Sequence, residues 1–353
     1  MPLDRNNHET SCFVALLSLP SASALACATC GCSLSTDAAT GYTSSAGWYA
    51  NLEYDYINQN QLRYGSHAIS PAQVAAINDA GGDQEVEHDT INRYATLGLT
   101  YAGNANWNVK LQLPYIDRSH TTYASASNPI TPDQLSGATV HGIGDIKLLL
   151  SYQGLLPTHN LGLQAGVKLP TGHYGGANAN DSGVVGRHPV GFSSGPLAQH
   201  PSPDNLLDTS LQSGTGSTDL IVGAYYYQPV SQNFDAFING QFQAAVKQKL
   251  DQTGQDYRPG NQATVSVGLR YQARPDITPQ LQLNLSRKNH DQGALADTPD
   301  TAGTVAYLSP GLTVSVLNNV HLYGFVQLPV YSKLEGYQVF PRWTATLGAA
   351  YAF

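Results

Sequence analysis

The last eleven residues of the chain alternate between two kinds of side chain. Odd positions from Trp343 to Phe353 carry large or apolar side chains, and even positions carry small or hydroxyl-bearing ones. Because a strand of roughly 9 to 11 residues crosses a bilayer with lipid-facing and lumen-facing positions in alternation, this pattern predicts a transmembrane β-strand. Trp343 and Tyr351 fall where interfacial aromatic side chains would lie. A single strand leaves its backbone groups unpaired in hydrocarbon, so a closed barrel is expected.

Similar alternation recurs from residue 47 onward. It predicts an all-β fold, a transmembrane antiparallel up-and-down β-barrel of 12 strands with short periplasmic turns and long extracellular loops. Long and short connections alternate strictly between the segments, as they would if each strand crossed the bilayer, and both termini then lie in the periplasm. The predicted strands are 47–58, 90–102, 106–118, 142–153, 160–170, 217–228, 233–247, 262–273, 278–288, 303–316, 319–330 and 341–353.

The same alternation assigns residues to the lumen. Five acidic and five basic residues fall on the inner face, so a strong filter for one sign of charge is not indicated. Inward aromatic rings fit a slot for small amphipathic solutes, but they equally fit packing against the wall or tethering of the N-terminal segment. The residues expected to line the solute path are Lys110, Asp145, Lys147, Lys168, Tyr225, Tyr227, Phe237, Arg270, His321, Tyr323 and Phe325.

Composition narrows the function classes. No run of eighteen apolar residues exists, so helical membrane spans are excluded. The 34 Gly and 21 Tyr suit strands that alternate small lumen residues with interfacial rings. The net charge of −8 comes without a basic patch, which argues against nucleic acid as a partner. A length of 353 residues would allow two soluble domains, but a barrel of this length forms one.

The N-terminal residues resemble an export signal. Residues 12–19 are apolar, and Ala24-Leu25-Ala26 offers a cleavage site of the small-x-small kind. We therefore expect a signal peptide over 1–26, a flexible periplasmic Cys-rich segment over 27–46 and a barrel over 47–353, located in the bacterial outer membrane. The expected partners are the lipid bilayer, a small-molecule solute and the outer-membrane barrel assembly machinery, which would recognise Tyr351 and Phe353 as an assembly signal.

Three cysteines follow the expected cleavage site, namely Cys27, Cys30 and Cys32. In the oxidising periplasm they could form a disulfide, and Cys27 could carry a lipid anchor. Their thiolates could instead hold a soft metal such as copper(I) or zinc, the one cofactor that the sequence suggests. The segment could enter the lumen or reach a periplasmic partner.

Eight histidines lie in or beside the expected outer loops without the short spacing of a metal site. They are expected to be solvated, and a loosely gathered surface site is the alternative that stays open. They are His67, His88, His120, His141, His173, His188, His200 and His290. Residues 191–195 (Gly-Phe-Ser-Ser-Gly) match the nucleophile-elbow pattern, but they lie in a Gly/Ser/Pro-rich loop without the strand and helix that the motif needs. No convincing catalytic set is found, so an enzyme is not predicted.

Three short motifs mark predicted strand ends near the outer rim. They are 113–115 (Leu-Pro-Tyr), 142–145 (Gly-Ile-Gly-Asp) and 166–172 (Gly-Val-Lys-Leu-Pro-Thr-Gly). In these motifs the chain resembles outer-membrane transporter-like barrels of the phenol-degradation MetA-pathway family, over about residues 47–353. The resemblance implies an outer-membrane channel that admits aromatic or hydrophobic compounds, and it implies no catalytic residues.

The sequence therefore predicts a passive, porin-like channel for small solutes, with aromatic or amphipathic compounds as candidates. The loops at about 171–216 and 59–89 are expected to gate or decorate the outer exit, and the former could fold inward. Two alternatives stay open. The barrel could serve as a mount for a metal- or thiol-active Cys segment, or it could be an outer-membrane lipid esterase or deacylase with a catalytic site built from loops.

Overall fold

The structure, a computed structural model, describes residues 45–178, 182–200, 205–274 and 276–353. Its strands are β1 (Gly47–Gly65), β2 (His67–Ala68), β3 (Glu87–Ala102), β4 (Trp107–Tyr123), β5 (Leu135–Ile143), β6 (Ile146–Tyr152), β7 (Leu161–Leu169), β8 (Tyr174–Ala177), β9 (Val184–Arg187), β10 (Phe192–Ser194), β11 (Ser217–Pro229), β12 (Phe234–Gln248), β13 (Gln262–Tyr271), β14 (Ile277–Lys288), β15 (Gly303–Leu317) and β16 (Val320–Ala352). Strands of such alternating sequence pair side by side, because each buries one face and leaves the other for lipid.

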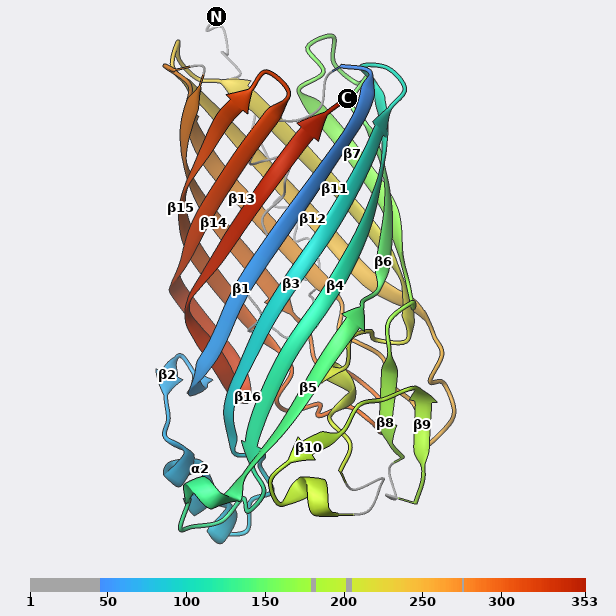
Figure 1. The fold of residues 1–353 in the computed structure, drawn as a ribbon, viewed down its shortest axis with the longest axis vertical. Coiled ribbons are helices and arrows are strands. Elements are labelled where there is room, and N and C mark those ends of the chain that lie inside the picture. Colours follow the sequence, from blue (N-terminus) through green and yellow to red (C-terminus); the bar gives the residue numbers. More distant parts are fainter. Residues whose placement is uncertain (1–44, 179–181, 201–204, 275) are drawn as a thin grey trace, which may run out of the picture.

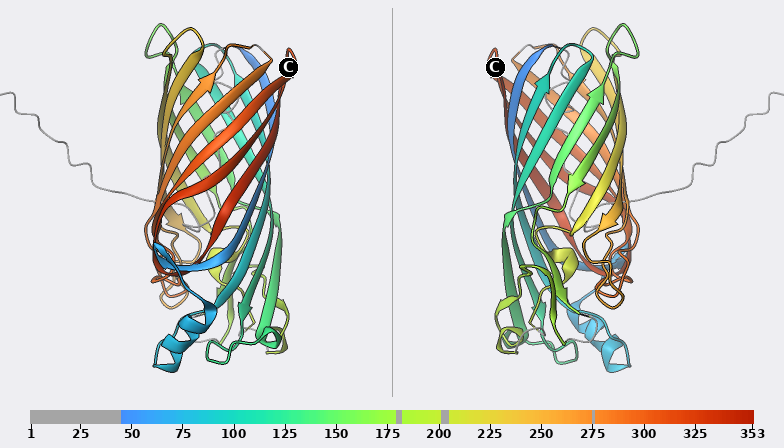
Figure 2. Two further views of the ribbon diagram at one scale, coloured as in Figure 1. Left: turned by 90° about the vertical axis from the view of Figure 1, so that its left-hand side faces the viewer. Right: turned by 90° about the vertical axis from the view of Figure 1, so that its right-hand side faces the viewer.

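The strands form a closed antiparallel barrel (Figure 1). Within the described part of the chain, eleven strands complete the ring in the order β4, β3, β1, β16, β15, β14, β13, β12, β11, β7 and β6, and β6 pairs with β4 to close it. The C-terminus lies at the end that carries the short turns, and the long loops gather at the opposite end (Figures 1 and 2). The predicted all-β barrel is thus confirmed.

The ring does not contain the twelve separate strands that the sequence predicts, because β16 runs through both of the last two segments. Its residues 320–334 pair with β15, and its residues 334–352 pair with β1. Gly336, with a φ of +70°, lies close to the point where the pairing changes partner. Figure 2 shows the red strand leave the short-turn end and return to the C-terminus there. One continuous element therefore covers two passes of the wall.

The fourth predicted strand is also different, because it is interrupted. β5 pairs with β4 through residues 135–143, and β6 pairs with β4 through residues 147–152. Gly144 and Asp145 lie at the break between them. The strand begins at Leu135 rather than at 142, so the wall extends further outward than predicted.

The outer loops contain structure that the alternation did not predict. β2, β8, β9 and β10 lie there, together with helix α2 (Pro71–Asp79) and three short 3-10 helices, Pro132–Gln134, Leu197–Gln199 and Thr209–Leu211. α2 begins at a capping box formed by Ser70 and Gln73. Val74 of this helix packs against Leu62 and Val339, which fixes α2 to the rim. Among the described residues, no helix is long and apolar enough to cross a membrane.

The outer face of the barrel is apolar where lipid would contact it. On β14, Leu281 and Leu283 are each 47% exposed, whereas Gln282 and Asn284 are 1% and 0% exposed. Polar residues inside and exposed leucines outside are the reverse of a soluble protein, and they are what a bilayer requires.

Aromatic side chains border this apolar surface. Trp48 and Tyr101 pack with ring centroids 4.9 Å apart at the short-turn end, where Tyr351 also lies. Tyr56 and Trp343 pack at 5.7 Å at the other border. The positions of Trp343 and Tyr351 agree with two interfacial belts.

Candidate functional site

The residues predicted to line the solute path lie at inward-facing positions of the wall. Lys110 is on β4, Lys147 on β6, Lys168 on β7, Tyr225 and Tyr227 on β11, Phe237 on β12, Arg270 on β13, and His321, Tyr323 and Phe325 on β16, with Asp145 at the break between β5 and β6. Their contacts divide them into rings that pack on the wall and a charged junction near the outer end.

The inward aromatic rings lie against glycines of neighbouring strands. Tyr225 is paired with Gly162 of β7, and its ring occupies the space that a Cβ on Gly162 would take. Phe325 lies in the same way on Gly311 of β15. The Tyr225 hydroxyl donates to Gln153 Oε1 at 2.7 Å, which holds that ring along the wall. The rings therefore line the lumen instead of projecting across it.

Phe237 and Tyr323 follow the same rule. Phe237 is paired with Gly268 of β13, and Tyr323 covers Gly348 in the other half of β16. The Tyr323 hydroxyl donates to a Glu53 carboxylate oxygen at 2.8 Å. A glycine opposite each ring makes room for it, so the wall-packing interpretation of these residues fits the structure.

A buried charged junction lies toward the outer end of the lumen. Lys168 Nζ lies 3.0 Å from Asp145 Oδ2 and 3.2 Å from Asp219 Oδ2. It also donates to Ser217 Oγ at 3.1 Å and to Thr215 Oγ1. Because the ammonium contacts two carboxylates and two hydroxyls, the buried positive charge of Lys168 is fully partnered.

The three sequence motifs behind the family resemblance meet at this junction. The Gly144 N–H donates to Pro114 O at 2.8 Å, and Thr171 Oγ1 donates to Gly144 O at 2.7 Å. The Gly172 N–H donates to Asp145 Oδ1 at 3.1 Å. The three motifs therefore contact one another at the outer end of the wall. Here the chain leaves the barrel after β7, and it re-enters the barrel at the start of β11.

Residues 205–216, here called the inner loop, fold against the inside of the barrel. Arg118 Nη1 on β4 donates to Leu211 O at 2.5 Å and to Gln212 O at 3.3 Å. Leu211 packs in an apolar cluster that includes Val140 of β5. Residues 205–216 of the long loop thus fold inward and narrow the outer end of the lumen.

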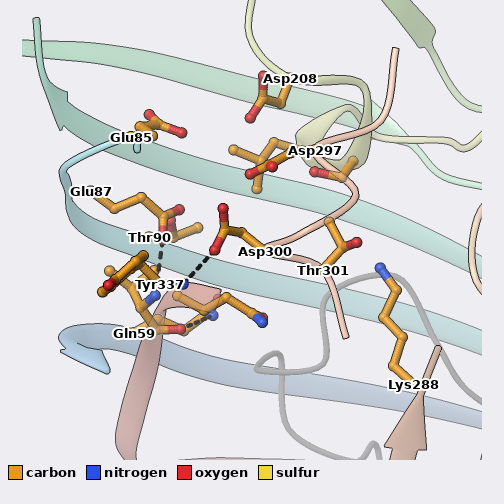
Figure 3. Close-up of a pocket in the computed structure, with 14 residues that line it drawn as sticks. Gln59, Glu85, Glu87, Thr90, Asp208, Lys288, Asp297, Asp300, Thr301 and Tyr337 are labelled. Atoms are coloured by element: carbon orange, nitrogen blue, oxygen red, sulfur yellow. Dashed lines mark hydrogen bonds between the residues drawn. The ribbon is translucent and has the colours of Figure 1, made fainter. Parts of the chain in front are cut away.

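An acidic cavity of about 50 Å³ lies beside the inner loop. Figure 3 shows carboxylates from several separate segments around it. Of the described residues that line it, five are acidic, namely Glu85, Glu87, Asp208, Asp297 and Asp300, and one is a lysine, Lys288. Lys288 Nζ lies 2.6 Å from Asp291 Oδ1 and is already paired. The mouth therefore carries an excess of negative groups.

Crowding and burial change how these carboxyls titrate. Burial raises the pKa of Asp208 to about 6, and the negative charge of Glu85 acts in the same direction. Burial, followed by the charge of Asp300, raises the pKa of Asp297 to about 8. Burial also raises the pKa of Asp300. The Asp297 and Asp300 pair therefore keeps a proton to higher pH than an ordinary carboxyl does.

His120 does not lie in solvent, so its predicted place among solvated loop histidines is wrong. It faces inward on β4, is 1% exposed, and places Nε2 3.4 Å from Glu85 Oε1. It lies outside the membrane-spanning part of β4, whose exposed apolar positions end at Tyr115. Burial lowers the pKa of His120, but contact with the Glu85 carboxylate raises it by more, and the net shift is upward.

The nucleophile-elbow match has the wrong structural context. Ser193 and Ser194 lie within β10, and both hydroxyls donate to Gly137 O, at 3.3 and 3.5 Å. The segment continues into a single 3-10 turn, Leu197–Gln199. A nucleophile at a strand-to-helix turn is not formed here.

Several predicted features are not tested by the structure. Cys27, Cys30 and Cys32, with the expected signal peptide, lie outside the described residues. Tyr351 and Phe353 pack edge to face at 4.7 Å at the end of the last strand, and their role in barrel assembly stays a prediction.

Comparison with solved structures identifies the fold. The chain superimposes on the COG4313 outer membrane channel from Pseudomonas putida F1 with a TM-score of 0.58 and 10% identity, covering 91% of this chain and 100% of that one. The toluene transporters TbuX of Ralstonia pickettii and TodX of P. putida each give a TM-score of 0.42, at 11% and 12% identity. They cover 88% and 87% of this chain and 90% of theirs.

Neither a protein-family model nor a curated protein matches the sequence. The similarity to an outer-membrane channel fold is drawn from the first of these structures alone, because the TM-scores of the two transporters are too low to support it. The protein has the fold of a bacterial outer-membrane β-barrel channel, as the sequence predicted. Its resemblance to the phenol-degradation MetA-pathway family stays a prediction.

Proposed function

We propose that the protein is a passive outer-membrane channel for small amphipathic solutes, aromatic compounds among them. The observation that carries this proposal is the inner loop, which Arg118 holds against the inside of the outer end. A loop anchored inside a barrel leaves a narrower path than the strands alone enclose, so the channel would select by size.

The chemistry of the lumen supports amphipathic solutes. Phe237 and Phe325 point inward among amides and carboxylates and are 4% and 3% exposed, so a solute that displaces the side chains over them would meet apolar and hydrogen-bonding groups together. Lys168 lies between Asp145 and Asp219, so acidic and basic side chains are mixed in this part of the path and no strong filter for one sign of charge is expected there.

The shared fold also supports a channel, since the superimposable solved structure is an outer membrane channel. Transport by this chain is then a matter of which solutes fit past the inner loop. A chemical step is not needed to explain any of the contacts found in the lumen.

Solute flux into liposomes tests the proposal. Purified full-length protein and a variant lacking residues 27–46 would be reconstituted, and swelling would be followed with a small aromatic alcohol and with a trisaccharide. We expect the aromatic alcohol to enter faster than it enters protein-free liposomes, and the trisaccharide to be excluded. Absence of protein-dependent flux of the small solute with either protein would contradict the channel.

A further inference from the structure

Three metal-ligating side chains converge at the outer mouth. Among the described residues, Glu85, Glu87 and His120 place one ligand atom each within 4.8 Å of one another. Glu85 precedes β3, Glu87 is its first residue, and His120 comes from β4. The register shift between Glu87 and Asp89 interrupts the regular alternation at the start of β3.

His120 is oriented as a ligand would be. Its Nδ1 lies 2.8 Å from Thr90 Oγ1, which is directly opposite in the β3–β4 pairing. Its Nε2 is buried and makes no hydrogen bond, although Glu85 Oε1 lies 3.4 Å away. When a hydroxyl accepts the Nδ1 proton of a histidine, the lone pair remains on Nε2, which is the usual arrangement for metal binding.

The surrounding charge favours a cation. Glu85 and Glu87 line the acidic cavity together with Asp208 of the inner loop, Asp297 and Asp300 (Figure 3). The lysine of this cavity is paired with another carboxylate, Asp291. A divalent ion at the cluster would add positive charge beside this group of carboxyls.

We propose that Glu85, Glu87 and His120 bind one divalent transition-metal ion of the Zn²⁺ class at the outer mouth. One imidazole nitrogen and two carboxylates suit zinc and similar ions better than Mg²⁺ or Ca²⁺, which prefer oxygen alone. Metal–ligand distances of about 2 Å require ligand atoms about 3 to 4 Å apart, so the three ligand atoms, which lie within 4.8 Å of one another, would have to approach by about 1 Å at most. The ion would join the segment before β3 to the wall, beside the inner loop.

Zinc titration of the metal-depleted, full-length protein tests the site. Isothermal titration calorimetry should show one zinc equivalent that His120→Gln and Glu87→Gln lose. The control His88→Gln should keep this equivalent, because His88 is an exposed histidine of the same rim that contacts Thr121 instead. Thr90→Val leaves every ligand in place and should weaken binding by about 10- to 100-fold, as loss of an outer-shell partner does.

Zinc-edge X-ray absorption of the wild-type protein needs no variant and should show one imidazole with oxygen ligands. Sulfur ligands for the only bound ion would assign zinc to the Cys27 segment and overturn the proposal. Equal stoichiometry and affinity in the wild type and His120→Gln would overturn it too, because His120–Glu85 would then be an ion pair. An equal loss of zinc binding in Asp300→Asn would also overturn the proposal, because the acidic cavity as a whole would then bind the ion. Solute flux through the barrel is a separate measurement, and its result does not decide whether the metal site exists.

Discussion

Removal of the Arg118 side chain should release the inner loop. Arg118 lies on the inner face of β4 and is 5% exposed. Besides its two bonds to the inner loop, it donates through Nε to Asn92 Oδ1 at 2.6 Å and through Nη2 to the Tyr94 hydroxyl at 2.7 Å. The contacts with Asn92 and Tyr94 of β3 thus fix the guanidinium, and the guanidinium in turn holds the inner loop.

The size of the effect follows from the two carbonyl contacts. A hydrogen bond to a charged group contributes about 1.5 to 3 kcal/mol. Counting the 2.5 Å bond to Leu211 O in full and the 3.3 Å bond to Gln212 O in part gives about 2 to 4 kcal/mol. Because about 1.4 kcal/mol changes an equilibrium tenfold, the released state should become roughly 30- to 700-fold more populated in Arg118→Ala.

Single-channel recording in planar bilayers measures this change. Arg118→Ala should show larger or more frequent open events than the wild type. Arg93→Ala is the matched control, because Arg93 lies on the outer face of β3 at the same rim and pairs at 3.6 Å with Asp117. If Arg118→Ala and Arg93→Ala both record like the wild type, the inner loop does not control the path, and the reasoning is refuted.

Three further predictions concern the wall and the mouth. Leu283→Arg, on the lipid face, should lower the free energy of unfolding in lipid vesicles by about 2 to 4 kcal/mol, whereas Gln282→Arg in the lumen should lower it less; equal effects would argue against the assigned faces. Gly162→Ala should push the Tyr225 ring off the wall and reduce single-channel conductance, and an unchanged conductance would mean that this ring does not border the path. Raising the pH from 5 to 9 should increase cation selectivity in reversal-potential measurements, because the Asp208 and Asp297 carboxyls, whose pKa values are raised, lose their protons over this range. Asp297→Asn should remove the part of this increase that occurs near pH 8. Selectivity that does not depend on pH would contradict the prediction.

The wall could be predicted from sequence because lipid imposes a strict alternation. β14 shows this best, with Leu281, Leu283 and Leu285 exposed and the residues between them buried. The outer part of β1 was missed since residues 58–61 read Asn-Gln-Asn-Gln, which is polar on both faces and carries no such signal. The register with β16 also shifts there, so the regular two-residue period is lost.

The acidic mouth could not be predicted in the same way. Glu85 and His120 are far apart in sequence, and they meet only through the pairing of β3 with β4. Short spacing in the sequence identifies metal ligands that are neighbours along one strand or helix. It does not identify ligands that come from two paired strands. The junction around Asp145 could be predicted only in part. Its sequence motifs indicated the strand ends, but they did not indicate that Asp145 and Lys168 form an ion pair.

Spin labels along β14 test the central claim most directly. In a background in which the four native cysteines are replaced, single labels would be placed at residues 280 to 285 of the protein in lipid vesicles. We expect oxygen dissolved in the bilayer to relax the labels at 281, 283 and 285, and we expect the labels at 280, 282 and 284 to be shielded from it. Labels equally accessible to a water-soluble relaxant at all six positions, without a two-residue period, would contradict a barrel embedded in lipid.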